Sequence, residues 1–104
     1  MKIFLMGRPY HLKIVDTDPE LEPRLVGRID YRSNQITIDK NSTSMLEVLF
    51  HEIAHLYFKP LRENLPNTLE GLCDFYAFIM EDIYYHNGPD IFVKIHNFLS
   101  SNVE

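Results

Sequence analysis

At residues 49–57 the chain reads Leu49-Phe50-His51-Glu52-Ile53-Ala54-His55-Leu56-Tyr57. On an α-helix, residues four positions apart lie on one side and about one turn apart, so the two imidazoles can meet at a single point. Glu52 projects about 100° around the helix from His51, beside that point. This is the HExxH pattern, in which two histidines bind zinc and the glutamate is the general base for the water that zinc activates. The stretch therefore predicts a helix that carries two metal ligands, His51 and His55, and a catalytic base, Glu52.

A zinc ion held by two histidines needs a third protein ligand and leaves a fourth position for water. The extended pattern HExxHxxGxxH is excluded, because Phe58 and Leu61 stand where its glycine and its third histidine would be. The other known arrangement takes a glutamate from a following helix, and Glu70 is the candidate. Glu70 could instead serve only as a capping residue in the first turn of that helix.

Asp74 follows Glu70 by four residues, so the two carboxylates share one helical face. From there Asp74 could accept a hydrogen bond from the far ring nitrogen of a ligand histidine, which fixes the ring and raises its basicity. Aspartate is unfavourable in the middle of a helix, and such a bond to His51 or His55 would compensate for it. The alternative is a solvated surface carboxylate.

The rest of the pattern predicts four strands followed by three helices. Alternating apolar residues and turn signals indicate strands at 3–6, 10–16, 25–31 and 35–39, with Arg8-Pro9 between the first two and a loop at 17–24. The last two strands are expected to form a hairpin. Helices are expected at about 44–58, 67–86 and 89–99, the second ending at Asn87-Gly88. The chain therefore reads as α+β, with a small, mostly antiparallel sheet of three or four strands packed on about three helices.

The helices carry two further signals, one at their ends and one in the middle of the second. Ser44 with Glu47 has capping-box spacing, although residue 42 or 43 could be the cap, and Asn67 with Glu70 repeats that spacing. The apolar residues in the middle of the second helix are expected to belong to the core; they are Phe75, Tyr76, Phe78, Ile79 and Met80.

Length and composition limit the class of protein. A chain of 104 residues is expected to form a single domain, residues 1–104, and 45% hydrophobic with 24% charged residues is typical of soluble globular proteins. The net charge of −5, without any run of Lys or Arg, argues against nucleic acid as a partner. No segment has the length of a membrane span or of a signal-peptide core. Because Cys73 is the only cysteine, no intrachain disulfide can form, and a cytoplasmic location is expected.

The pattern of His51-Glu52-Ile53-Ala54-His55 followed by Glu70 and Asp74 resembles that of gluzincins, in which HExxH precedes an ExxxD helix. The layout of elements is similar to the small ImmA/IrrE-like metallopeptidase domains of phages and bacteria. The resemblance covers residues 25–86 and implies a minimal zincin-like fold, Zn²⁺ as cofactor, Glu70 as third ligand and Glu52 as catalytic base. The sequence departs from the family in being very short, so no regulatory or DNA-binding domain is expected beside the peptidase domain.

The expected function is zinc-dependent hydrolysis of peptide bonds in an extended or unfolded polypeptide. The substrate is expected to lie antiparallel to an exposed sheet edge at residues 35–39. The alternative is a catalytically silent zinc-binding or interaction module, such as a phage-type adaptor or inhibitor. Whether the protein also binds a partner protein is left open by the sequence. The residue that stabilises an oxyanion is not singled out among four candidates, which are Arg62, Tyr84, Tyr85 and His86.

Overall fold

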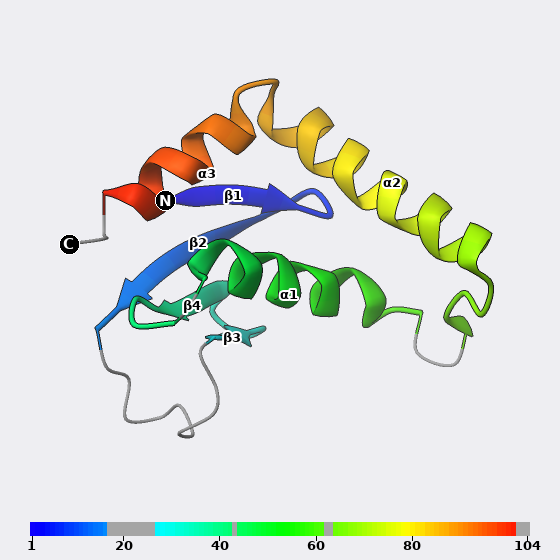
Figure 1. The fold of residues 1–104 in the computed structure, drawn as a ribbon, viewed down its shortest axis with the longest axis horizontal. Coiled ribbons are helices and arrows are strands. Elements are labelled where there is room, and N and C mark those ends of the chain that lie inside the picture. Colours follow the sequence, from blue (N-terminus) through cyan, green and yellow to red (C-terminus); the bar gives the residue numbers. More distant parts are fainter. Residues whose placement is uncertain (17–26, 43, 62–63, 102–104) are drawn as a thin grey trace.

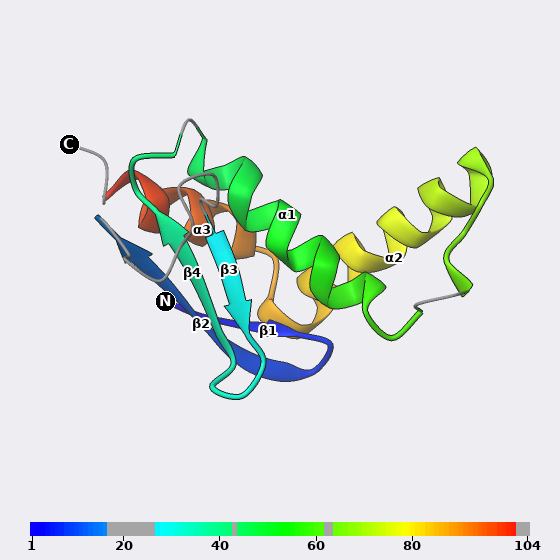
Figure 2. The same cartoon turned by 90° about the horizontal axis from the view of Figure 1, so that it is seen from below.

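The computed structural model describes residues 1–16, 27–42, 44–61 and 64–101. The loop expected at residues 17–24 lies outside these ranges, as does Arg62. The described strands are β1 (Lys2–Leu5), β2 (Arg8–Val15), β3 (Gly27–Asp30) and β4 (Gln35–Asp39), and the helices are α1 (Met45–Phe58), α2 (Leu69–Asn87) and α3 (Ile91–Ser100). The helices lie on one face of the sheet (Figures 1 and 2). The fold is α+β, as predicted.

The strand order is β1-β2-β4-β3, and every pair is antiparallel except β2 with β4. β3 and β4 form the predicted hairpin. The prediction that residues 35–39 form a sheet edge is wrong, because β4 pairs on both sides. After β2 the chain first forms β3 at the edge of the sheet. It then returns as β4, which lies between β2 and β3. Among the described strands, β3 and β1 are the edges.

The core lies between the sheet and the helices. Side chains alternate along the strands, so that Ile3, Tyr10 and Leu12 are buried under the helices while His11 and Lys13 are exposed on the other side. The helices contribute the buried residues of their apolar stripes, which are Met45, Leu49, Ile53, Leu56, Tyr57, Ile79, Ile83, Ile91, Ile95 and Leu99.

Pro9 does not separate two strands as expected. It lies within β2 opposite Phe4, and the turn falls at Met6 and Gly7, whose φ angles are 55° and 75°. The N–H of Phe4 donates to Asn87 Oδ1 at 2.7 Å, and its carbonyl accepts from Asn87 Nδ2 at 2.7 Å. The Asn87 amide thus acts as a strand partner for the edge strand β1 and fixes the end of α2 there.

Side-chain caps set the start of both long helices. Ser44 caps α1 and accepts a hydrogen bond from the N–H of Glu47 at 3.2 Å, as the capping-box spacing predicted. Thr68, not Asn67, caps α2, because its hydroxyl accepts from the N–H of Gly71 at 3.0 Å. α2 ends where expected, at Gly88, whose φ of 92° favours glycine.

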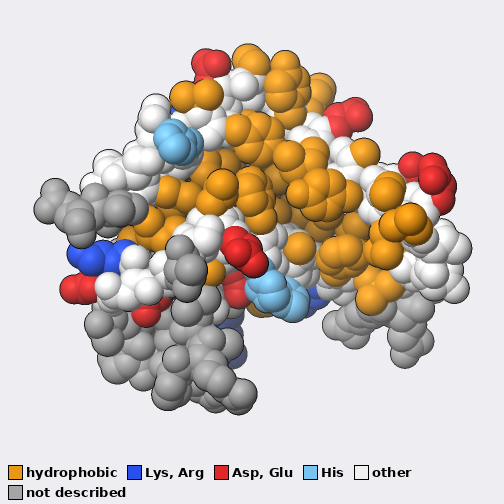
Figure 3. All heavy atoms as spheres, in the orientation of Figure 1, with side chains coloured by type: hydrophobic (Ala, Val, Ile, Leu, Met, Phe, Trp, Pro, Cys, Tyr) orange, Lys and Arg blue, Asp and Glu red, His pale blue; other side chains and the backbone are white. Residues whose placement is uncertain are grey.

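The middle of α2 is less buried than predicted. Ile79 belongs to the core, but Tyr76 is 62% exposed and Phe78 is 55% exposed. α2 packs on β1 and α3 through its C-terminal half, while its N-terminal half extends beyond the sheet (Figures 1 and 2). Hydrophobic side chains consequently cover much of the surface over the helices, with histidine side chains over α1 at the border of this apolar surface (Figure 3).

A small polar network joins α1, α2 and the β1–β2 turn. The hydroxyl of Tyr57 donates to Asp82 Oδ2 at 2.5 Å and accepts from the N–H of Met6 at 3.2 Å. Burial and the hydrogen bond to Asp82 both raise the pKa of Tyr57 above its ordinary value, because they favour the neutral phenol. The ring is almost fully buried, so the network is part of the folded core.

Tyr57→Phe is therefore expected to change how stability depends on pH. A raised pKa in the folded state gives stability that is present below about pH 10 and lost at higher pH, because the phenol of the unfolded chain ionises first. The free energy of unfolding of the wild type should fall above about pH 10, by up to about 1.4 kcal/mol per pH unit from this group. Urea unfolding between pH 8 and 11 should show a flatter curve for Tyr57→Phe; parallel curves would contradict the role of Tyr57.

Candidate metal centre

His51 and His55 come together as the helical spacing predicts. Both are exposed, on the side of α1 away from the core, and their Nε2 atoms are 3.0 Å apart. The ring centroids are 4.7 Å apart and the rings meet edge to face at 77°. With both Nε2 atoms turned to the same point, the pair can share a proton between neutral rings or bind one cation through two lone pairs.

The spacing of the two nitrogens fits zinc. Zn–N bonds are about 2.0–2.1 Å long, so two ligands at a tetrahedral angle lie roughly 3.3–3.4 Å apart. The observed separation of 3.0 Å differs from this by a few tenths of an ångström, which small rotations of the exposed rings supply. His51 and His55 therefore fit two positions of a zinc site.

Glu52 points to a different side of α1 from the two histidines. It is only 9% exposed and lies against β3, where its Cγ is 3.4 Å from the position that a Cβ on Gly27 would take. No described residue hydrogen-bonds its carboxylate. Burial is the main cause that raises the pKa of Tyr31, and the negative charge of Glu52 adds to it. Glu52 is thus a largely buried carboxylate between α1 and the start of β3.

Gly27 allows β3 to approach α1 beside Glu52. A Cβ at this position would lie 2.5 Å from Val48 Cγ1 and 3.3 Å from the carbonyl oxygen of Thr37. Sequence reasoning placed Gly27 in a strand but gave it no role. The available signal is a glycine inside a strand, because such a glycine often marks a place where another segment approaches the backbone closely.

Gly27→Ala is expected to destabilise the fold by about 1–3 kcal/mol, because the added methyl group overlaps Val48. The double variant Gly27→Ala/Val48→Ala should recover part of this loss, because it removes the overlapping methyl. Urea unfolding of both single variants and the double variant gives the coupling free energy, which should exceed about 0.5 kcal/mol. Additive effects would show that the two residues are not in contact.

Glu70 and Asp74 are exposed on α2. Within the described ranges, no three His, Cys, Asp or Glu side chains lie close enough to bind one metal ion, so the structure does not bring Glu70 to the histidine pair. Asp74 does not form the expected hydrogen bond to His51 or His55; it lines a hollow of about 490 Å³ with other residues of α2. The assignment of Glu70 as third ligand stays a prediction.

The remaining polar candidates of the described ranges lie on α2. Cys73 is an exposed free thiol on α2. His86 lies beside Asp82, with 3.2 Å between Nδ1 and Oδ1. Tyr84 and Tyr85 are largely exposed on the same helix. None of them belongs to a described metal-binding cluster with the histidine pair.

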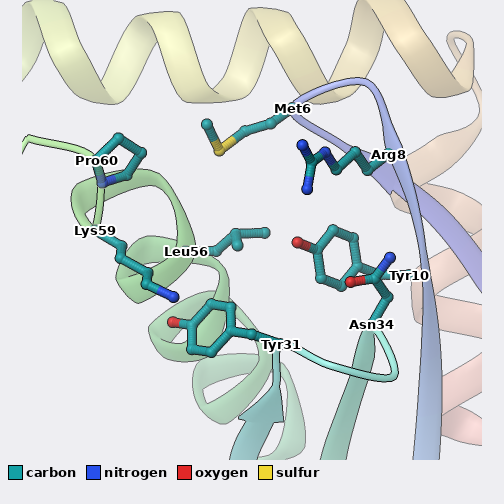
Figure 4. Close-up of a pocket in the computed structure, with 8 residues that line it drawn as sticks. All are labelled: Met6, Arg8, Tyr10, Tyr31, Asn34, Leu56, Lys59 and Pro60. Carbon is teal, nitrogen blue, oxygen red and sulfur yellow. The ribbon is translucent and has the colours of Figure 1, made fainter.

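A cavity of about 500 Å³ lies where the C-terminal end of α1 faces the β1–β2 and β3–β4 turns (Figure 4). Leu56 and Lys59 line it, one turn after Glu52 and His55 respectively. Tyr31, which the charge of Glu52 influences, forms another part of its wall. This cavity adjoins the C-terminal end of the HExxH helix. It could not be predicted from the sequence, because its walls come from three separate segments.

In the part of the chain that the structure describes, no helix has the length and apolar character needed to cross a membrane. Comparisons with models of protein families, with curated proteins and with solved structures give no match to this chain.

Proposed function

We propose that this protein is a zinc-dependent peptidase of the ImmA/IrrE-like kind. The observation that carries the proposal is the histidine pair, with Nε2 atoms 3.0 Å apart on an exposed helix surface. Glu52, a largely buried carboxylate, follows His51 on the same helix. Two convergent imidazoles and an adjacent carboxylate are the residues that metal-assisted hydrolysis of an amide requires.

The roles of the residues follow from their chemistry. His51 and His55 would hold the ion, and Glu70 is proposed as the third ligand. A bound zinc ion lowers the pKa of water toward neutrality and polarises a carbonyl group. Glu52 would accept the proton from the attacking water and transfer it to the leaving amine, a task for which a carboxylate without another described hydrogen-bond partner is suited.

An extended or unfolded polypeptide is the substrate class that the surface supports best. The histidine pair is exposed, and the helices around it present a broad apolar surface (Figure 3). Unfolded chains expose the apolar side chains that such a surface can bind. The substrate strand was expected to pair with residues 35–39, which form the inner strand β4. β3, an edge among the described strands, can offer its backbone groups to the substrate instead. With one cysteine in the chain, we place this activity in the cytoplasm.

A metal-dependent cleavage assay tests the proposal. The zinc-loaded protein is incubated with a denatured, fluorescently labelled protein, and the fragments are identified by mass spectrometry. We expect cleavage that stops when a chelator removes the metal and returns when zinc is added back. Zinc binding at the histidine pair without any cleavage would contradict the proposed activity.

One observation favours the second candidate, a zinc-binding or interaction module without turnover. Among the described residues, no Cys, Asp or Glu completes a metal-binding group with the histidine pair, so Glu70 could be the third ligand only if α2 approached α1. A partner protein could supply that ligand instead. The same assay separates the two functions, because a silent module would bind zinc and leave the labelled substrate intact.

A further inference from the structure

The cavity at the end of α1 presents hydrogen-bond donors of two kinds to its interior. Arg8 and Lys59 contribute positive charges, and Tyr10, Tyr31 and Asn34 contribute two phenols and an amide (Figure 4). No carboxylate is among the lining residues that belong to the described ranges. The site has the composition that binds an anion, with a guanidinium suited to two parallel hydrogen bonds to a carboxylate.

The two positive charges are not neutralised within the described residues. Neither Arg8 nor Lys59 has a described carboxylate within ion-pair distance, and Lys59 Nζ instead lies 3.5 Å from the centre of the Tyr31 ring. Arg8 is on the same side of the sheet as Tyr10, because alternate residues of a strand share a face. The sheet therefore directs Arg8 toward the helices, beyond the end of the apolar core, where its side chain is exposed and can reach a charged ligand in the cavity.

The cavity lies at a defined distance from the proposed reaction centre. Lys59 follows His55 by four residues, which is about 6 Å along the helix axis. An extended peptide advances about 3.3 Å per residue. A peptide whose cleaved bond lies at the histidine pair would therefore place a side chain about two residues away in the cavity.

The direction of the peptide follows from β3. Gly27, at the start of β3, lies beside Val48 in the first turn of α1, and Tyr31, just after β3, lies beside Lys59 at the other end of the helix. β3 and α1 thus run in the same direction. A peptide that pairs antiparallel with β3 enters the cavity with residues on the N-terminal side of the cleaved bond.

We infer that this cavity binds the side-chain carboxylate of an Asp or Glu about two residues before the cleaved bond, so that the protein selects acidic sequences. The inference rests on the proposed peptidase function for its position. The anion-binding chemistry of the cavity can be measured separately, without cleavage.

The binding test uses three small probes in NMR titrations: N-acetyl-glutamate with a blocked α-carboxyl, its glutamine counterpart, and N-acetyl-alaninate with a free α-carboxylate. We expect shifts at Tyr31, Asn34 and the Arg8 side chain, with the blocked glutamate binding at least about tenfold more tightly than the glutamine probe. Arg8→Gln and Lys59→Met should each weaken this binding about tenfold. Lys13→Met, which removes an exposed cation from the opposite face of the sheet, should have no effect.

Each outcome decides between the alternatives. Equal binding of the glutamate and glutamine probes, or binding that Arg8→Gln and Lys59→Met leave unchanged, overturns the inference. Tighter binding of N-acetyl-alaninate assigns the cavity to a C-terminal carboxylate and overturns the side-chain assignment. If the zinc-loaded protein cleaves a denatured protein without enrichment of Asp or Glu before the cut, the specificity is refuted and the peptidase function stands. If glutamate binds as expected but no substrate is cleaved, the peptidase function fails and the anion site stands.

Discussion

His51→Ala is expected to lower the affinity for zinc by more than about a hundredfold. Loss of a residue that only orients a metal ligand already costs 10–100-fold in affinity, and His51 would be a ligand itself. The remaining imidazole of His55 could still bind the ion, but without the second nitrogen 3.0 Å away. Competition with a chromophoric chelator measures the affinity, and His55→Ala should give the same loss.

His96→Ala is the matched control, because His96 is an exposed histidine on α3 that is outside the pair. Its zinc affinity and stoichiometry should equal those of the wild type. Since His51 and His55 are both exposed, their replacement should leave the free energy of unfolding of the metal-free protein nearly unchanged. Undiminished zinc binding in both alanine variants would show that the pair is not the zinc site.

Glu52→Gln is expected to reduce the turnover number by about 10²–10⁴-fold while zinc affinity is retained. General acid–base groups contribute rate factors of this size, and an amide cannot accept the proton of the attacking water. Glutamine has nearly the same shape, so it can occupy the narrow space beside Gly27. Steady-state cleavage of the labelled protein gives the rate, and metal analysis of the same sample gives the zinc content.

Glu47→Gln provides the comparison for Glu52→Gln, because Glu47 is an exposed carboxylate in the first turn of the same helix. Its turnover should remain within about a factor of two of the wild type. If Glu52→Gln cleaves at the wild-type rate, then Glu52 is a structural residue and the proposed proton transfer is wrong. Loss of both activity and zinc would place Glu52 among the residues that hold the metal site together.

Local sequence signals predicted the elements well, because each depends on neighbouring residues. The hydroxyl of Ser44 and the left-handed angle of Gly88 mark helix ends through bonds within a few positions. The approach of His51 to His55 is local in the same sense, since one helical turn separates them. The order of the strands is not local, and nothing in residues 35–39 indicates that β3 would lie outside β4.

The relation between α1 and α2 could not be read from the sequence. The spacing of Glu70 and Asp74 shows that they share a face of α2, but not which way that face points. The angle of α2 depends on contacts far apart in the chain, such as the bond between Tyr57 and Asp82 and that between Phe4 and Asn87. These contacts fix the C-terminal half of α2 and leave Glu70 exposed.

The central claim is that His51 and His55 form a zinc site, and anomalous diffraction from crystals grown with zinc tests it most directly. Data collected on both sides of the zinc absorption edge should show one peak at bonding distance, about 2.0–2.1 Å, from both Nε2 atoms. The same map identifies the third ligand, which we predict to be Glu70. Zinc peaks elsewhere on the protein, with none between His51 and His55, would contradict the account.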